Sequence, residues 1–267
     1  RLVGVFYIGR PIGANPMFKS SGDILLLTQT GLFPLTRAML SSTLNRSSAV
    51  SNKIDFLFSE LASQYGDNPG WQGLVFPHDN LLLVNVPIQS GSISIQLVMN
   101  TITGAWTKFT GWDGFCFAEF RNSLFFGAAG KVVKCLEGEA DFGGPIHCKL
   151  RTAFNSLGSR SLKHVKMIRP LIRTTEAMEL RMGLDVDYED SELLYPFTVG
   201  SAGAESIWDS AVWDLSEWSA PAPYQRHWRS VHSKEGFTFS LSLEADVKEI
   251  EVTWSATDFL YQKGGVL

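Results

Sequence analysis

The stretch ISIQLVMNTITGAWTKFTGWDGFCFAEFRNSLFFGAAGKVVKCL, residues 93–136, decides the fold class of this chain. In it, short runs of β-branched and aromatic residues alternate with turn residues at intervals of about eight to twelve positions. No helical periodicity separates the runs, so they predict β-strands joined by tight turns in one antiparallel meander. A meander of about 40 to 50 residues has the size of a β-propeller blade, and we expect residues 93–136 to form one blade.

Two shorter stretches share this pattern, GDILLLTQTGLFPL at 22–35 and DNLLLVNVP at 79–87. Each places a polar turn before a run of apolar residues, and the long interval between them contains an insertion. The insertion has a helical pattern that puts apolar side chains on one face, namely Ile54, Leu57, Phe58, Leu61 and Tyr65. We therefore expect one helix at about 51–66, which covers a blade or docks a partner, within a propeller-like β domain at 1–140.

A Gly-rich acidic linker, residues 137–145, predicts a domain boundary after the blades. Six or seven longer strand-like runs follow it with almost no helical pattern. They predict a β-sandwich or small β-barrel at 141–267. The whole chain is thus expected to be all-β, with partial propeller-like blades and one inserted helix before a sandwich or barrel.

The overall composition excludes some classes of function. The net charge of the 267-residue chain is −4, so no global basic field points to nucleic-acid binding. No run reaches the roughly 20 apolar residues of a membrane-spanning helix. The three cysteines lack CxxC spacing and are expected to be buried free thiols of a protein made in a reducing compartment. The strand-like start RLVGVFYIG leads us to expect residues upstream of it.

Charge is unevenly distributed in the second domain. Residues 149–173 carry seven basic side chains and no acid, whereas residues 176–258 carry seventeen acids. The basic segment could contact phosphates, dock a neighbouring subunit or form a solvated face, and head-to-tail subunit assembly would suit the segregated charges. The basic residues that we assign to a possible subunit interface are Lys163, Lys166, Arg169 and Arg173.

An acidic cluster follows the basic segment and consists of Asp185, Asp187, Glu189 and Asp190. Alternation along a strand would place Asp185, Asp187 and Glu189 on one face, where a hard cation such as Ca²⁺ could bind. No glycine supplies the sharp loop of an EF-hand, so a solvated strand end is the alternative. No metal site or cofactor is predicted.

A tryptophan-rich loop at 207–218 contains Trp208, Trp213 and Trp218 at intervals of five residues. This spacing fits neither a strand face nor a helical stripe. The tryptophans therefore pack beneath the loop, anchor a neighbouring subunit as part of a possible interface, or stack on a sugar.

The catalytic motifs sought in the sequence are absent: GxSxG, HExxH, GxGxxG and the P-loop. His147 and Cys148 are adjacent and would point to opposite faces of a strand, which argues against a Cys–His dyad. No catalytic residue is predicted, and we do not expect an enzyme.

Several phrases resemble, in order, the tail nozzle or tail-hub proteins of short-tailed phages, also called packaged-DNA stabilisation proteins. The phrases include TGLFPLTRAM (30–39), YGDNPGWQGLVFP (65–77), QLVMNTITGAWTKFTGWD (96–113), LRTAFNSLGSRSLKHVKMIRPLI (150–172), LDVDYED (184–190), IWDSAVWDLSEW (207–218) and VTWSATDFLYQKGGVL (252–267). The resemblance covers nearly the whole chain and matches the C-terminal portion of a longer family member.

This resemblance implies a structural virion protein, assembled in the host cytoplasm. Six copies would form a ring below the portal and adaptor, contact other tail proteins, extend the DNA channel, retain the packaged genome and conduct double-stranded DNA during ejection. An acidic wall would let DNA slide with little phosphate binding. About three blade patterns are visible, however, whereas a closed propeller needs at least four. The alternative function is a carbohydrate-binding or glycan-processing β-propeller, suggested by the blades and the abundant tryptophan.

Overall fold

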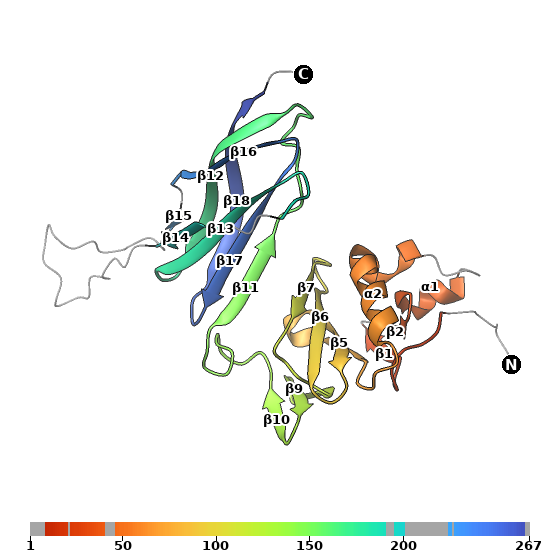
Figure 1. Cartoon of the computed structure of the whole chain (residues 1–267). Coiled ribbons are helices and arrows are strands. Elements are labelled where there is room, and N and C mark those ends of the chain that lie inside the picture. Colours follow the sequence, from red (N-terminus) through yellow and green to blue (C-terminus); the bar gives the residue numbers. More distant parts are fainter. Residues whose placement is uncertain are drawn as a thin grey trace, which may run out of the picture. The chain divides into compact units, whose positions relative to one another are not determined.

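A computed structural model describes residues 9–20, 22–40, 46–190, 195–200, 224–225 and 227–264. The chain divides into two compact units, Arg1–Glu137 and Gly138–Leu267, so the division falls in the Gly-rich linker. Both units consist mainly of antiparallel strands, which confirms the predicted all-β class (Figure 1). Each unit is described by itself below.

The first unit contains three antiparallel sheets that follow one another along the chain. The first sheet consists of β1 (Met17–Ser20), β2 (Asp23–Thr28) and β3 (Gly31–Pro34). The second consists of β4 (Gln72–Phe76), β5 (Leu81–Gln89), β6 (Ile93–Asn100) and β7 (Trp106–Phe109). The third consists of β8 (Cys116–Phe120), β9 (Ser123–Ala128) and β10 (Lys131–Lys134).

The β4–β7 sheet buries both of its faces. Leu82 and Val84 of β5 join a core with the β1–β3 sheet, whereas Leu83, between them, joins a second core with Phe117 and Phe126 of the β8–β10 sheet. Successive side chains of a strand point to opposite faces, so the middle sheet is packed on two sides. Neighbouring propeller blades pack in this way, but three sheets do not close a ring, and the propeller remains a prediction.

The prediction that residues 93–136 form one blade is wrong. β6 and β7 pair with β5 in the second sheet, whereas β8–β10 form the third. The chain between them crosses from one sheet to the next. The carbonyl of Trp112 accepts hydrogen bonds from Ser94 Oγ (2.9 Å) and Gln96 Nε2 (2.8 Å), which hold the crossing segment against β6. The Trp112 ring packs on Phe126 of the next sheet, with centroids 5.9 Å apart.

The predicted helix is confirmed as α2 (Asp55–Tyr65), and a 3₁₀ turn, η2 (Val50–Ile54), leads into it. Phe58 and Leu61 are buried in the core with the first two sheets, as the helical pattern predicts. Trp71 Nε1 donates to the carbonyl of Tyr65 (2.8 Å) and so satisfies an acceptor at the end of α2.

A second α-helix, α1 (Leu35–Leu40), and the 3₁₀ turns η1 (Arg46–Ser48) and η3 (Pro77–Asp79) are not predicted from the sequence. The N-terminal turn of α1 depends on a distant group, because the backbone N–H and the hydroxyl of Thr36 both donate to the carboxylate of Asp23. A cap that comes from thirteen residues earlier leaves no local capping signal.

The second unit contains two four-stranded sheets. One consists, in spatial order, of β11 (Ile146–Arg151), β17 (Phe239–Val247), β13 (Met178–Val186) and β14 (Tyr195–Val199). In the other, β12 (Lys163–Thr174) pairs with β18 (Val252–Lys263) and also with β15 (Tyr224–Gln225) and β16 (Arg229–Gly236).

Both sheets of the second unit contribute to one hydrophobic core. Ile168 and Ile172 of β12 pack in it with Leu180 of β13 and Leu241 of β17. The sequence predicted either a β-sandwich or a small β-barrel for this unit. Two sheets around a shared core make it a β-sandwich. The strand order makes β11 and β14 the edge strands of their sheet.

Candidate interaction surfaces

Lys163, predicted at a subunit interface, is instead fully buried at the start of β12. Its Nζ donates to the backbone carbonyls of Ser159, Ser161 (2.9 Å) and Phe237 (3.3 Å). Burial, together with the nearby charge of Lys263, lowers the pKa of Lys163. The ammonium group therefore holds a loop to the start of β17, and the prediction of an interface role is wrong.

The other predicted interface residues of β12 are more accessible. Lys166 and Arg173 are exposed, and Arg169 is half-buried. Arg169 Nε donates to the carboxylate of Asp258 on β18 (2.9 Å), and its guanidinium lies 4.8 Å from the centre of the Trp228 ring. Its charge is thus already neutralised within the unit. Lys166, Arg169 and Arg173 all lie on β12.

The predicted acidic cluster is dispersed. β13 ends at Val186, and Asp187 and Tyr188 have positive φ (48° and 69°), so the strand alternation does not continue to Glu189. Asp185 is buried, and its carboxylate accepts from Arg151 Nε (2.9 Å) and Ser242 Oγ (2.6 Å).

Of the remaining carboxylates of the cluster, only Asp190 shares a partner with Asp185, namely Arg151. Asp187 accepts from the backbone N–H groups of Phe237 (2.9 Å) and Thr238 (2.8 Å), Asp190 pairs with Arg151, and Glu189 is exposed. Strand alternation therefore does not bring them together for a cation. Across the described ranges, no group of three or more His, Cys, Asp or Glu side chains is placed to hold a metal ion.

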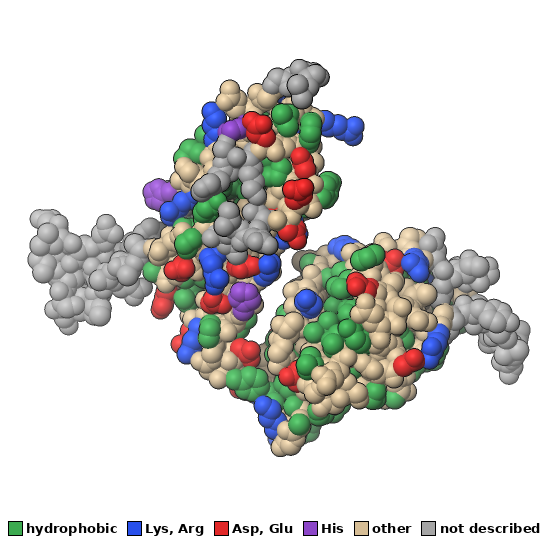
Figure 2. Space-filling model, in the orientation of Figure 1, with side chains coloured by type: hydrophobic (Ala, Val, Ile, Leu, Met, Phe, Trp, Pro, Cys, Tyr) green, Lys and Arg blue, Asp and Glu red, His purple; other side chains and the backbone are tan. Residues whose placement is uncertain are grey.

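A ladder of ion pairs covers the outer face of the β11–β17–β13–β14 sheet. His147 Nδ1 lies 2.8 Å from Asp246, Lys149 Nζ lies 2.6 Å from Glu244, and Arg151 pairs with Asp185 and Asp190. Arg181 of β13 also pairs with Asp246 (2.9 Å). Figure 2 shows acidic and basic side chains interspersed over this unit.

This ladder corrects the interpretation of segregated charge. Basic and acidic residues that are separate in the sequence pair across neighbouring strands, because β11 lies antiparallel to β17. The charges of Lys149 and Arg151 are therefore compensated within their own sheet. Sequence reasoning missed Glu244 and Asp246 as partners. The signal was present in the alternation of Lys149 and Arg151 on one strand with Glu244 and Asp246 on another.

A polar network is buried at one end of the β4–β7 sheet. Asn85 Nδ2 donates to the carbonyls of Gly70 (2.8 Å) and Gly114 (3.1 Å), and Gln96 Nε2 donates to Asn85 Oδ1 (2.9 Å). Ser94 Oγ donates to the Gly114 carbonyl (3.0 Å). These bonds tie β5 and β6 to the segment that crosses to the third sheet.

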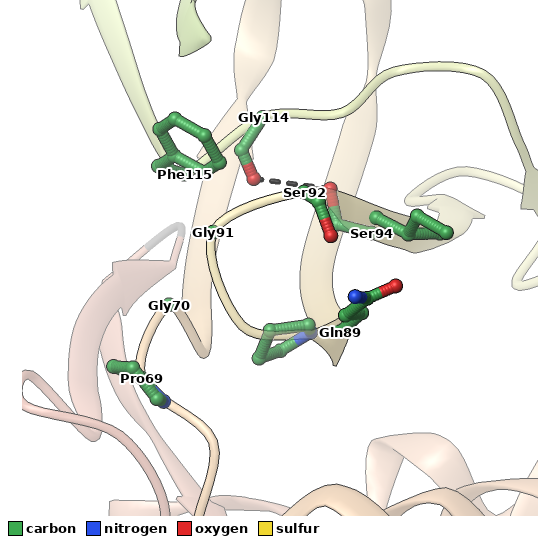
Figure 3. A pocket seen from close by; sticks show the side chains of 10 residues that line it. Pro69, Gly70, Gln89, Gly91, Ser92, Ser94, Gly114 and Phe115 are labelled. Carbon is green, nitrogen blue, oxygen red and sulfur yellow. Dashed lines mark hydrogen bonds between the residues drawn. The ribbon is translucent and has the colours of Figure 1, made fainter. Parts of the chain in front are cut away.

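A shallow pocket beside this network is shown in Figure 3. Its lining includes Pro69, Gly70, Gln89, Ser94, Gly114 and Phe115. Its volume is about 10 Å³, which is room for one water molecule.

The cysteines differ from the prediction that all are buried. Cys135 is buried in the core between the second and third sheets, and burial raises its pKa to about 12. Cys116 and Cys148 are exposed and free. They lie on β8 and β11, which are edge strands of their sheets.

The predicted tryptophan anchors Trp208, Trp213 and Trp218 lie outside the described residues. Trp254 is partly buried against the sandwich core, and its Nε1 donates to the Ala256 carbonyl (3.0 Å). Of the helices in the described ranges, none is long and apolar enough to cross a membrane.

The sequence of this chain was also compared with those of other proteins. Neither the protein-family models nor the curated proteins that were searched include a match to this chain. The function is therefore argued from the residues themselves.

Proposed function

We propose that this chain is a structural subunit of the tail nozzle, or hub ring, of a short-tailed phage. In this role several copies, six in the form that the resemblance implies, surround a channel below the portal and adaptor. The ring retains packaged double-stranded DNA and conducts it during ejection, and the chain is no enzyme. The proposal starts from the ordered phrases that run from residue 30 to residue 267.

The observation that carries the proposal is the internal compensation of basic charge in the second unit. Of the seven basic residues of 149–173, Lys149, Arg151 and Arg169 pair with carboxylates and Lys163 is buried, whereas Arg160, Lys166 and Arg173 are exposed. Free Lys and Arg side chains bind phosphates and release counterions, which makes DNA adhere. Lys and Arg side chains that already pair with carboxylates bind phosphate more weakly. This supports a surface past which DNA slides better than one that grips it.

The proposal is tested by native mass spectrometry and negative-stain electron microscopy of the full chain. We expect a closed ring with six-fold symmetry. Fluorescence anisotropy with a labelled duplex at 0.15 M salt should give a Kd weaker than about 10⁻⁵ M, at the weak end of non-specific binding. A monomer that binds glycans would favour the carbohydrate-binding alternative, and tight DNA binding would contradict the sliding surface.

A further inference from the structure

The two sheets of the second unit differ in width (Figure 1). One has four strands side by side, in the order β11, β17, β13 and β14. The other is at most three strands wide, because β15 and β16 pair with different parts of one edge of β12 and β18 pairs with the other edge. Among the described strands, the second sheet is therefore one strand narrower than the first.

The position without a strand lies opposite β11. The short connections 175–177 and 248–251 join β12 to β13 and β17 to β18, so β12 lies over β13 and β18 lies over β17. Beyond β17 the first sheet continues with β11, whereas beyond β18 the second sheet has no described strand. One edge of β18, a strand of 12 residues, thus carries backbone N–H and C=O groups that no described strand pairs with.

The face of β11 at this position is apolar and uncovered. The strand register pairs Cys148 with Ala245 and Leu150 with Leu243, and both partners are buried in the sandwich core. Cross-strand partners point to the same face of a sheet, so Ile146, Cys148 and Leu150 face inward. Ile146 and Leu150 are nevertheless 41% and 53% exposed, and Cys148 is exposed. An inward face with this exposure lacks the strand that would cover it.

The open position admits a single strand and not a second sandwich. If two copies paired their β18 edges, the β11 strands would collide, because each β11 extends one strand beyond β18 on the opposite sheet. A single extended segment meets no such obstacle. It would add to the β18 edge through backbone hydrogen bonds and lay alternate side chains on Ile146, Cys148 and Leu150. The side chains on that face of the segment must therefore be apolar.

The sequence that connects β14 to β15 has this pattern. In it Ala211, Trp213 and Leu215 recur at alternate positions, and in an extended chain the polar Asp214 and Ser216 would point the other way. β14 is an edge strand of the first sheet, and β15 pairs with the edge of β12 that is opposite to β18. Both ends of the connection therefore lie on the side of the sandwich away from the open position.

We infer that residues 211–215 of one copy add as a strand to the β18 edge of the next copy and cover the inward face of β11. Donor and acceptor lie on opposite sides of the sandwich, so the contact is heterologous, and repeated contacts of this kind close into rings or extend into filaments. The inference rests on the proposed ring and names the contact that joins its subunits. A packed tryptophan buries about 150–250 Å², so Trp208, Trp213 and Trp218 would supply much of the roughly 800 Å² that each partner of a stable interface buries.

Disulfide trapping tests the contact in the full chain. Cys148 is a free thiol on the acceptor face, and C116S removes the other exposed cysteine. In that background, A211C or L215C with an added oxidant should give a ladder of covalent oligomers on a non-reducing gel. I102C, at the exposed β6–β7 turn, is the matched control and should give no ladder. A disulfide within one chain would place the segment on its own copy and overturn the inference, as would no disulfide in either variant.

Charged substitutions test the same contact without a covalent bond. I146D with L150D changes the acceptor face, where both side chains are about half exposed, so the thermal transition should remain cooperative. W213D changes the donor. Each variant should be monomeric where the wild type forms a ring, and their mixture, with one intact donor and one intact acceptor, should give a dimer and nothing larger in sedimentation velocity. A ring that persists in either variant would overturn the inference and leave the proposed ring, whereas a wild type that forms no oligomer would overturn the proposed function as well.

Discussion

Lys163 is a basic residue whose role is set by three backbone carbonyls, one of them far from it in the sequence. Two of its acceptors lie in the loop just before β12, and the third, the carbonyl of Phe237, lies 74 residues later. Burying an ammonium group is costly unless its hydrogens have acceptors. Here all three have one, so the charged side chain can link the loop at 155–162 to the β16–β17 turn.

Replacing this lysine by methionine, K163M, should destabilise the second unit by about 1–3 kcal/mol. Methionine keeps most of the apolar stem but leaves the three carbonyls without the donor that the Lys163 ammonium group supplies. The free energy of unfolding is measured by urea denaturation. K166M, an exposed position on the same strand, is the control and should change stability by less than about 0.5 kcal/mol. Equal effects of the two variants would show that the carbonyl contacts of Lys163 contribute nothing.

At the scale of elements, strand β11 depends on its charged side chains. Every residue of β11 is exposed, so little apolar burial fixes it to β17 beyond the backbone hydrogen bonds. The ladder of His147, Lys149 and Arg151 with carboxylates on β17 and β13 supplies the cross-strand pairs. Such pairs stabilise antiparallel strands when opposite charges face each other.

The ladder predicts a pH dependence. The hydrogen bond from His147, with the charges of His147 and Arg181, lowers the pKa of Asp246 below its ordinary value. The folded state thus holds the carboxylate ionised, and its stabilisation is present above about pH 4 and is lost as the pH falls through the lowered pKa. D246N should lower the urea midpoint of unfolding at pH 7. Because the variant has no carboxylate at position 246, it should lose less stability than the wild type as the pH falls below about 4.

The matched control for this prediction is E251Q, which makes the same change in net charge next to β18. Glu251 is exposed and has no ion-pair partner within the described part of the chain. The urea midpoint of E251Q should follow that of the wild type from pH 7 to pH 3. If D246N and E251Q gave the same profiles, the lost stability would reflect net charge rather than the ladder.

Local sequence patterns predicted the helix, but they did not predict which sheet each strand joins. The helix was predictable because Phe58 and Leu61 recur at helical spacing within a single segment. The division of residues 93–136 between two sheets was not predictable, because it depends on hydrogen bonds between residues far apart in the sequence. Gln72 on β4 exchanges two hydrogen bonds of 2.8 Å with the backbone of Phe117, 45 residues later. Turn residues mark where strands end, but the partner of each strand is chosen by such contacts.

The same limit applies to the candidate interface. The basic residues of 149–173 were visible in the sequence, but their pairing with Glu244 and Asp185 required the register of β11, β17 and β13.

At the scale of the whole molecule, the two units have separate cores. The clusters around Leu82 and Phe117 are built from residues before 137, and the cluster around Ile168 is built from residues after it. Because domains with their own cores can generally fold alone, each unit should be an independent folding unit. The charges differ too, with a net charge of +1 for residues 1–140 and −5 for residues 141–267.

Fragments 1–137 and 138–267 test this independence. Each should give a cooperative thermal transition within about 4 °C of one of two transitions of the full chain in calorimetry, a difference that corresponds to about 1 kcal/mol for a domain of this size. Limited proteolysis of the full chain should cut first at 137–145, where the Gly-rich linker joins the units. A single transition in the full chain, with either fragment unfolded, would show that the cores stabilise each other. In that case the D246N and K163M effects would appear in the melting of the whole chain rather than in the second transition alone.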